Sequence, residues 1–265
     1  MADRKIISGT LEWASSSFNC VTGCAHDCRY CYARHAAVTR FHTVKPGQWK
    51  EEKVDPEALK KRFGKRSGTI MFPTAHDITP FTLEACKMVL GNMLSAGNRV
   101  LIVSKPHFQC IDSLCRWFPQ YKGQILFRFT IGASDDKVLG YWEPGAPSFD
   151  ERKSALALAH HNGFQTSVSM EPCLDWNNVV ENFHILAPHV TNSIWIGTMN
   201  KIDERVVVGD EPADRIAVST LRHQQCEENF QQTYEALKTH PLVRWKESLK
   251  KVFGMPLADE AGTDQ

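Results

Sequence analysis

Three closely spaced cysteines are the residues of this sequence best suited to chemistry. Cys24, Cys28 and Cys31 stand in the segment CAHDCRYC, whose Cys-x3-Cys-x2-Cys spacing puts three thiolates on one short loop. A closed zinc site normally takes four protein ligands in separated pairs, and an ordinary four-cysteine cluster leaves no iron open. Three cysteines on one loop therefore favour a [4Fe–4S] cluster with one open iron. Zinc with Cys20 as fourth ligand is the alternative, and His26 is expected to form a hydrogen bond rather than ligate.

The other cysteines need a different explanation. The chain has nine cysteines in 265 residues, an odd number. Thiols stay reduced in the cytosol, so a dense cluster there indicates metal binding before disulfides. Free cysteine is also a common small core residue. We expect that role for the scattered residues Cys86, Cys110, Cys115 and Cys226.

Short runs rich in β-branched and aromatic residues alternate with segments of helical spacing. The runs predict strands at Thr69–Pro73, Arg99–Ser104, Gln124–Ile131, Gln165–Met170 and Ser193–Gly197, and more weakly at Ser15–Asn19. The intervening segments predict helices at Thr82–Ala96, Phe149–Asn162, Asn177–Leu186 and Gln224–Thr239. Such alternation is typical of a parallel sheet with crossover connections. The predicted fold is α/β, with a partial (β/α)6 TIM-type barrel in residues 1–205 and a short helical C-terminal extension, residues 206–265, packed on the barrel.

The chemistry of such folds gathers where the strands end. The segments that follow the predicted strands are rich in polar and reactive residues, and we expect them to face one site. They are Cys20–Tyr32, Thr74–Pro80, Lys105–Phe108, Gly132–Asp136, Glu171–Asp175 and Thr198–Lys201.

The cysteine motif, with Tyr32 directly after it, resembles the signature of the radical S-adenosylmethionine (SAM) superfamily. The resemblance implies that SAM and a [4Fe–4S] cluster are the cofactors, with the open iron holding the methionine part of SAM. In that superfamily an electron from the cluster cleaves SAM, and the resulting 5′-deoxyadenosyl radical abstracts hydrogen from the substrate. An electron donor such as flavodoxin or ferredoxin is implied as a partner.

Three further segments are similar to the spore photoproduct lyase branch of that superfamily. They are VSKPHFQCIDSL (103–114), LFRFTIG (126–132) and WEPGAPSFDER (142–152). In that branch the third strand ends in Thr/Ser-Lys, the fourth carries Arg-Phe-Ser/Thr-Ile, and the Glu-Pro motif precedes the next helix. The similarity runs from about residue 18 to residue 175. Glu143 and Arg152 are expected to form a structural pair or to contact the ribose.

Matching positions in that branch imply that five residues lie near SAM. His76 and Asp77 stand where the lyase has Ser-Asp, and Lys105 matches a lysine close to the SAM carboxylate. Thr130 replaces a serine that contacts SAM, and Glu171 lies where backbone atoms approach the adenine. Structural alternatives are a surface lysine for Lys105, a helix cap for Asp77 and β-branched packing for Thr130.

The sequence departs from the lyase at one position that matters for the chemistry. The lyase carries a cysteine three residues before the aspartate, and this chain has Thr74 there. Because a hydroxyl is a poor hydrogen-atom donor, spore photoproduct repair is not expected. Cys173, in MEPCLD at a predicted strand end, is the candidate catalytic residue as a replacement hydrogen donor. A buried core thiol is the alternative for Cys173.

Composition sets the cellular context. The net charge is +1, which gives no field that would steer the whole chain to nucleic acid or membrane. The N-terminus MADRKIISGTLEW lacks the apolar run of a signal peptide, and no stretch reaches the roughly 18–20 apolar residues that span a bilayer. We expect a cytoplasmic protein with no membrane partner. Residues 206–256 interleave basic and aromatic side chains, which suit nucleic acid, but amphipathic core packing is favoured there.

The leading hypothesis is a radical SAM enzyme whose substrate is unidentified, with nucleic acid as one candidate class. A radical SAM enzyme that acts on a peptide or small molecule is the first alternative. The second is a non-catalytic zinc or Fe–S binding protein. The sequence does not resolve whether the reaction is that of a lyase, a transferase or an oxidoreductase.

Overall fold

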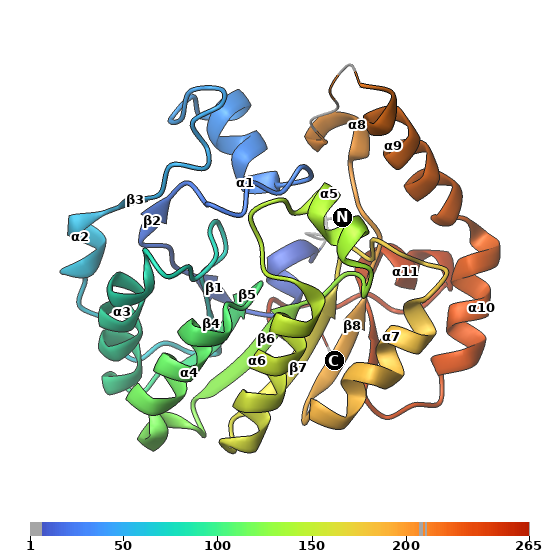
Figure 1. Cartoon of the computed structure of the whole chain (residues 1–265). Helices are drawn as coiled ribbons and strands as arrows, with labels where there is room; N and C mark the ends of the chain where they lie inside the picture. The colour runs from blue at the N-terminus through green and yellow to red at the C-terminus, as the bar shows by residue number, and fades with distance from the viewer. Residues whose placement is uncertain (1–6, 207–208, 210, 265) are drawn as a thin grey trace, which may run out of the picture.

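The computed structural model describes residues 7–206, 209 and 211–264, so the N-terminal segment predicted to lack a signal peptide lies partly outside the described residues. Seven parallel strands form one sheet in the order β1-β4-β5-β6-β7-β8-β9 (Figure 1). All six strands predicted from the sequence are present, which confirms the α/β class. The seven are β1 (Ser16–Ser17), β4 (Thr69–Phe72), β5 (Arg99–Ser104), β6 (Ile125–Thr130), β7 (Gln165–Met170), β8 (Ser193–Ile196) and β9 (Val243–Trp245).

Helices cross over between successive strands and pack in front of the sheet in the view of Figure 1. Capping residues determine where these helices begin and end, as α6 shows. Ser148 accepts a hydrogen bond from Glu151 N at the start of α6, and Gly163, at φ +76°, follows its end. The crossover helices are α3 (Leu83–Ser95), α4 (Phe108–Trp117), α6 (Phe149–His161) and α7 (Val179–Leu186), with α5 (Asp136–Trp142) before α6.

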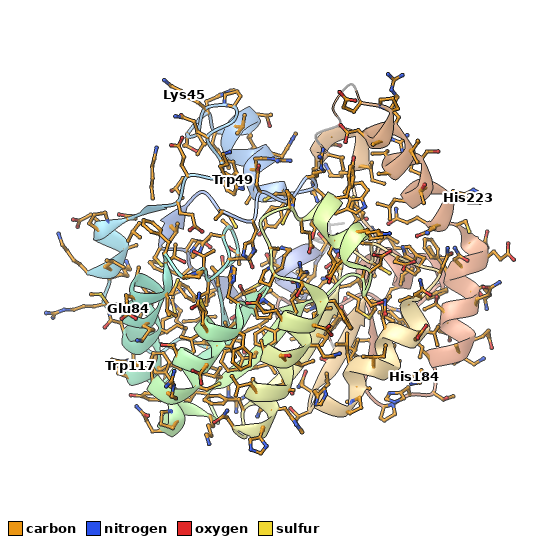
Figure 2. All side chains as sticks on the ribbon, in the orientation of Figure 1. Lys45, Trp49, Glu84, Trp117, His184 and His223 are labelled. Atoms are coloured by element: carbon orange, nitrogen blue, oxygen red, sulfur yellow. The ribbon has the colours of Figure 1, made fainter. Side chains whose placement is uncertain are left out.

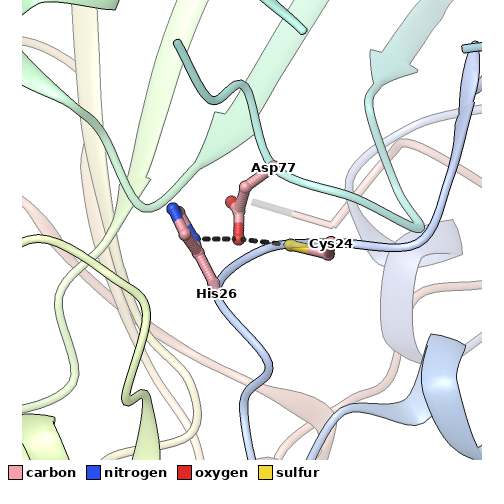
Figure 3. Close-up of side chains that lie close together, drawn as sticks. All are labelled: Cys24, His26 and Asp77. Carbon is pink, nitrogen blue, oxygen red and sulfur yellow. Dashed lines mark hydrogen bonds and ion pairs between the residues drawn. The ribbon is translucent and has the colours of Figure 1, made fainter. Parts of the chain in front are cut away.

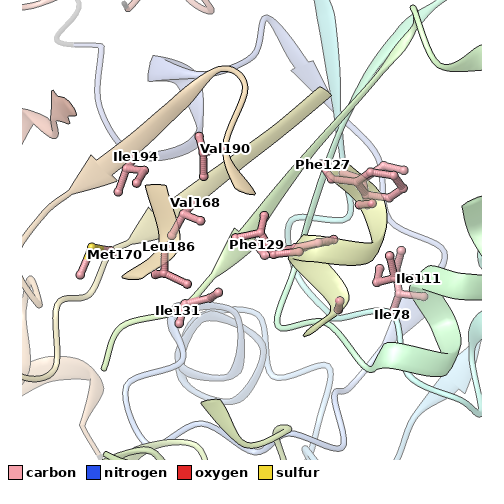
Figure 4. Packing of buried hydrophobic residues seen from close by; sticks show 14 of the residues in the cluster. Ile78, Ile111, Phe127, Phe129, Ile131, Val168, Met170, Leu186, Val190 and Ile194 are labelled. Carbon is pink, nitrogen blue, oxygen red and sulfur yellow. The ribbon is translucent and has the colours of Figure 1, made fainter. Parts of the chain in front are cut away.

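The main core lies between this helix layer and the sheet (Figure 4). Phe127 and Phe129 of β6 are fully buried there, together with Ile111 of α4 and Leu186 of α7. Aromatic side chains bury a large area each, so β6 at the centre of the sheet carries much of the hydrophobic stabilisation. Because side chains alternate along a strand, the intervening residues of β6 face the other side of the sheet.

The segment between β1 and β4 forms a small unit of its own at the upper left of Figure 1. Its two short strands pair antiparallel, with Val21 opposite Val54. Its elements are β2 (Val21–Thr22), α1 (Tyr32–His35), a π-helical turn (Ala36–Arg40), β3 (Lys53–Val54) and α2 (Pro56–Leu59). The cysteine loop follows β2 in this unit, and a long connection leads from α2 back to the sheet at β4.

The last sixty residues contain a strand as well as helices. We predicted only helices there, but β9 extends the sheet beyond β8, with Ile194 opposite Val243. The sheet therefore has seven strands, one more than the six predicted β/α units. The prediction missed β9 because a run of three residues is too short to show a recognisable pattern. The helices that follow β8 are α8 (Ile202–Arg205), just before this region, and α9 (Pro212–Gln224), α10 (Glu227–Leu237) and α11 (Glu247–Val252) within it. Short 3-10 turns elsewhere lie at Gly9–Glu12, Pro119–Tyr121 and Ala187–His189.

The N-terminal segment packs against the face of the sheet opposite the crossover helices. The Arg128 guanidinium, which donates to Ser167 Oγ (2.9 Å), lies over the Trp13 ring at 4.5 Å and over the Trp195 ring at 5.2 Å. Within the part of the chain that the structure describes, no helix combines the length and the apolar character needed to cross a bilayer.

A buried ion pair ties the two ends of the chain together. Lys246, directly after β9, places Nζ 2.7 Å from Glu12 Oε1 and 3.2 Å from Glu171 Oε2. Glu12 and Lys246 are each 1% exposed. Burial raises the pKa of Glu12 to about 7, although Lys246 opposes the rise. The C-terminal tail joins the same contact, since Gly262 N donates to Leu11 O (2.7 Å).

The raised pKa of Glu12 predicts a pH-dependent loss of stability. Glu12 has a higher pKa in the folded state than in the unfolded state, so protonation of Glu12 stabilises the fold. This contribution to the free energy of unfolding is fully present below about pH 4.5 and is lost as pH rises through about 7. Replacing Glu12 with Gln removes the titration. Between pH 5 and pH 8, this titration should lower the free energy of unfolding of the unaltered protein. The loss over the same range should be about 2–3 kcal/mol smaller in Glu12→Gln. Urea unfolding at both pH values measures this.

Glu84→Gln, on the exposed face of α3, is the matched control and should keep the pH dependence of the unaltered protein. Equal pH dependence in Glu12→Gln and in the unaltered protein would contradict the assignment.

Candidate active site

One cavity of about 940 Å³ opens where the parallel strands end. The residues that line it come from the cysteine loop and from the segments that follow β4, β5, β6, β7, β8 and β9. Eight of the nine site residues predicted from the sequence line this cavity: Cys24, Cys28, Cys31, His76, Asp77, Lys105, Thr130 and Glu171. Residues far apart in the sequence are thus brought to one site by the parallel order of the strands.

The cysteine loop is fixed by backbone contacts. Cys24 N donates to Trp49 O (2.8 Å), and Gly23 before it adopts φ +91°. A Cβ at Gly23 would lie 2.2 Å from Glu51 O, so only glycine permits this approach. At the other end of the loop, Cys31 caps α1 by accepting a hydrogen bond from Arg34 N to its Sγ (3.3 Å).

The WEPGAPSFDER segment packs directly onto this loop. Gly145 N donates to His26 O (3.1 Å), and Arg29 N donates to Trp142 O (2.9 Å). A Cβ at Gly145 would lie 2.1 Å from Ala25 O, which makes the approach specific for glycine. The similarity of this segment to the lyase branch therefore corresponds to a physical contact with the cysteine loop.

Glu143 and Arg152 form a fully buried pair, the first of the two roles predicted for them. Their side-chain atoms Oε2 and Nη1 are 2.5 Å apart, and neither side chain is exposed. Tyr30, between the second and third cysteines, donates its hydroxyl proton to Glu143. Arg152 also donates to the carbonyl of Thr130 (3.3 Å), at the end of β6. The pair therefore connects the cysteine loop to the central strand of the sheet.

Asp77 is the best-connected acidic residue of the cavity (Figure 3). Its Oδ2 lies 2.8 Å from His26 Nδ1 and 3.4 Å from Lys105 Nζ, and it accepts from Cys24 Sγ at 3.8 Å. Its Oδ1 accepts from the backbone N of Lys105 (2.7 Å). The predicted hydrogen-bonding role of His26 is confirmed. Asp77 does not cap a helix in this arrangement; it holds the cation that points into the cavity.

The charges of this pair stabilise each other. Burial would raise the pKa of Asp77, but Lys105 and His26 outweigh it and hold that pKa well below its usual range. Burial would likewise lower the pKa of Lys105, but Asp77 holds it well above the usual range. An aspartate–lysine ion pair therefore persists at neutral pH inside the cavity. Lys105 is not a solvated surface lysine, since its side chain is 12% exposed.

A chain of hydrogen-bonding groups runs from Asp77 toward the surface. His26 Nε2 lies 3.0 Å from His107 Nε2, and His107 Nδ1 lies 3.7 Å from Glu151 Oε1. Glu151 also accepts from Phe108 N (3.0 Å), the first residue of α4. These contacts attach the cysteine loop to α4 and α6 and fix the orientation of the His26 ring.

The three thiols of the loop fit a metal cluster better than free cysteines. Burial raises the pKa of Cys24, Cys28 and Cys31, while the Lys105 ammonium lowers each of them. Metal ions deprotonate coordinating thiols outright and replace the solvation that a buried thiolate lacks. All three thiols face the same cavity, and all are free of disulfides. This donor set suits the three-cysteine cluster predicted from the sequence.

The remaining predicted residues differ in placement. His76 lines the cavity, accepts from Cys20 N at Nε2 (3.3 Å) and is buried, and Glu171 faces both the cavity and Lys246. Cys173 is fully buried, is not among the described residues that line the cavity, and directs its thiol to Asp175 O (3.6 Å). Its role as a hydrogen donor stays a prediction.

Cys20 also turns away from the cavity. Its sulfur lies 4.0 Å from Cys86 Sγ in the core, and both residues are buried. A fourth-ligand role for Cys20 would require this contact to break.

Several lining residues were not predicted. Tyr30 lies inside the cysteine motif, within the segment Cys20–Tyr32 that was expected to face the site, but no role was predicted for its side chain. Trp49 packs on Cys24 from a loop that follows no strand, and Ser248 follows β9, the strand that was missed. The N-terminal lining residues Gly9 and Trp13 carry no motif that places them at a strand end.

No model of a known protein family matches this chain. The uncharacterised protein ORF301 of Acidianus two-tailed virus is 27% identical over 182 residues, which cover 64% of this chain and 58% of the viral protein. The matched region is thus less than two thirds of either chain.

Solved structures identify the fold. A spore photoproduct lyase variant with bound AdoMet (SAM) and dinucleoside spore photoproduct aligns with a TM-score of 0.57 and 16% identity, over 86% of this chain and 75% of the lyase. This chain shares its fold with spore photoproduct lyase. SuiB of Streptococcus suis, bound to SAM, aligns with a TM-score of 0.54 and 9% identity, over 94% of this chain and 54% of SuiB. Both neighbours were solved with bound SAM, and the shared fold confirms the α/β class predicted from the sequence.

The close approach at Gly145 predicts that a single methyl group disturbs the cysteine loop. Gly145→Ala would place Cβ 2.1 Å from Ala25 O, and relieving that clash must move the loop backbone. Overpacking of this kind costs about 1–3 kcal/mol, so the melting temperature and the iron bound per chain after anaerobic reconstitution should both fall.

Gly140→Ala is the matched control, because a Cβ there meets nothing within 4 Å and the residue lies inside α5. That variant should be unchanged or slightly more stable. Full iron binding and unchanged melting in Gly145→Ala would show that the contact does not constrain the loop.

Proposed function

We propose that this protein is a radical SAM enzyme, built on an incomplete barrel of parallel strands, that holds a [4Fe–4S] cluster at Cys24, Cys28 and Cys31. The observation that carries the proposal is the shared cavity. Three cysteines with the radical SAM spacing and the Asp77–Lys105 pair line the same space at the strand ends. The fold shared with two SAM-bound structures supports the same conclusion.

The chain's own residues bind and orient SAM in this proposal. When bound, the cluster supplies the electron that cleaves SAM to methionine and a 5′-deoxyadenosyl radical. Lys105 offers a compact ammonium to the carboxylate of SAM. Asp77 holds that ammonium through Oδ2, while its Oδ1 accepts from the backbone N of Lys105. Thr130, Glu171 and His76 line the same cavity and are assigned to the remainder of the cofactor.

The substrate is proposed to carry phosphate, with nucleic acid as the class to test first. Lys201, Arg205 and Lys251 line the cavity on the side of β8 and β9, where they would meet an anionic group. The lyase neighbour binds a dinucleoside, which supports the same class. A peptide or small-molecule substrate is the alternative outcome of a substrate screen.

The proposal does not extend to spore photoproduct repair. Thr74 lines the cavity where the lyase carries its cysteine, and its side chain is fixed by a hydrogen bond from Asn19 Nδ2 to its Oγ1 (2.8 Å). Within the described residues, the three proposed cluster ligands are the only thiols that line the cavity. A thymine radical formed there would lack a thiol to quench it.

Single cysteine replacements test the cluster. After anaerobic reconstitution, Cys24→Ala, Cys28→Ala and Cys31→Ala should each lose stoichiometric iron or hold an inactive cluster, because each removes one thiolate ligand. Iron analysis, the absorbance near 400 nm and dithionite-driven SAM cleavage report the effect. Cys173→Ala is the control and should keep its iron.

Cys20→Ala separates the cluster from the zinc alternative. If this variant lost its metal while Cys31→Ala kept full SAM cleavage, the four-ligand site would be correct and the proposal wrong. A colourless protein that binds zinc and leaves SAM intact would lead to the same conclusion.

Replacing Lys105 tests the SAM-binding role. A hydrogen bond to a charged group is worth about 1.5–3 kcal/mol, so Lys105→Ala should weaken SAM binding by roughly tenfold or more. Lys153→Ala, on the exposed side of α6, is the control and should bind SAM normally. Equilibrium binding to the reconstituted proteins gives both dissociation constants. The same constant in Lys105→Ala and in the unaltered protein would remove Lys105 from the SAM site.

A further inference from the structure

A short segment after the cysteine loop packs on two of its cysteines, and its exposed cations are not among the described residues that line the cavity. Trp49, Ala37 and Val44 pack around Cys24 and Cys31. Figure 2 shows Trp49 turned inward below the loop, whereas Lys45 projects outward at the top of the molecule. We call residues 34–53 the basic cap. A molecule that approaches Cys24 and Cys31 from this side of the loop contacts the cap.

The cap is strongly basic in a nearly neutral protein. It contains five Lys or Arg and two Glu, a net charge of +3, whereas the whole chain has a net charge of +1. One of its two acids is turned inward, since Glu52 accepts hydrogen bonds from Ala25 N (3.2 Å) and Thr79 Oγ1 (2.7 Å). The outer surface of the cap is therefore more positive than its composition suggests.

Three exposed cations of the cap have no carboxylate partner among the described residues. Arg34 pairs with Asp27 (3.2 Å) and Lys53 with Glu51 (3.6 Å). Among the described residues, no carboxylate lies within ion-pair distance of the other three cations, which are exposed: Arg40, Lys45 and Lys50. Phe41 is 61% exposed, and the Arg40 guanidinium lies 5.2 Å from its ring centre. Unpaired cations and an exposed aromatic ring form a surface complementary to an acidic partner.

We propose that the basic cap is the docking surface for a small acidic electron-transfer protein that carries a flavin or an iron–sulfur group. The inference rests on the proposed function, which requires an external electron. In that function SAM and substrate would occupy the cavity, whose described lining does not include Arg40, Lys45 or Lys50, so a donor docked on these cations would not compete with them. In the step itself the reduced donor loses one electron and the oxidised cluster gains it, with no bond made or broken. Encounters of this kind use small interfaces steered by charge.

Charge reversal on the cap tests the assignment. The probe is purified flavodoxin of net negative charge, and the readout is the second-order rate of reduction of the reconstituted cluster by reduced flavodoxin. Lys45→Glu/Lys50→Glu should lower this rate at least tenfold at low ionic strength, since steering contributes roughly 10–10³-fold. The rate for the unaltered protein should fall as salt rises, and the rate for the variant should change little.

The control variant makes the same change in net charge elsewhere. Lys122 and Lys238 lie just before β6 and β9, at the opposite end of the sheet from the cavity. Lys122→Glu/Lys238→Glu should accept electrons from flavodoxin at the normal rate. Reduction by dithionite and binding of SAM should be unchanged in both variants. Should the reversal on the cap lower the melting temperature, Lys45→Gln/Lys50→Gln replaces it, with an intermediate effect expected.

Two results would overturn the proposal. The first is an equal flavodoxin rate in the cap variant and the control. The second is loss of binding to a fluorescent single-stranded DNA with an unchanged flavodoxin rate, because basic residues continue beyond the cap through Lys60–Arg62 and the surface would then be a nucleic-acid site. If the unaltered protein failed to hold iron, the proposed function would fail separately. Calorimetric binding of oxidised flavodoxin to the same variants would still decide the role of the cap.

Discussion

The buried ion pair between Asp77 and Lys105 joins the parts of the site that lie far apart in the sequence. The carboxylate contacts the cysteine loop through His26 and Cys24, and it contacts the end of β5 through the backbone and side chain of Lys105. Removing one partner of such a pair leaves an unpaired buried charge, which is strongly destabilising. The same pair therefore holds the loop on the sheet and presents a cation to the cavity.

Backbone contacts also hold the cysteine loop in place. Gly23 and Gly145 allow the cysteine loop to approach two neighbouring segments more closely than any side chain permits. The Glu143–Arg152 pair then anchors Tyr30 of the loop to the end of β6. Each face of the loop is thus restrained by a different contact, and its three thiols are directed to one side. A cluster site needs such a preorganised loop, because its ligands must converge without reordering the chain.

Much of the site was predictable because its signals are local. The cysteine spacing indicated a cluster by itself, and Lys105 and Glu171 directly follow predicted strands. The resemblance to the lyase branch supplied Asp77 and Thr130. Cys173 also stands at a predicted strand end and still lies outside the cavity lining, since a residue's place after a strand does not fix the direction of its side chain. Trp49 and Ser248 were missed because tertiary packing, not local pattern, brings them to the cavity.

The sequence by itself determined the parallel α/β class, the position of the strands and the residues suited to hold a cluster, since periodicity and motif spacing are local properties of the chain. Tertiary structure alone decided that β9 joins the sheet and that Lys246 pairs with Glu12 across the molecule. It also decided that a basic cap packs on Cys24 and Cys31 of the cysteine loop. Three-residue strands and contacts between distant segments leave no periodic signal, because their stability comes from the partner that folding brings to them.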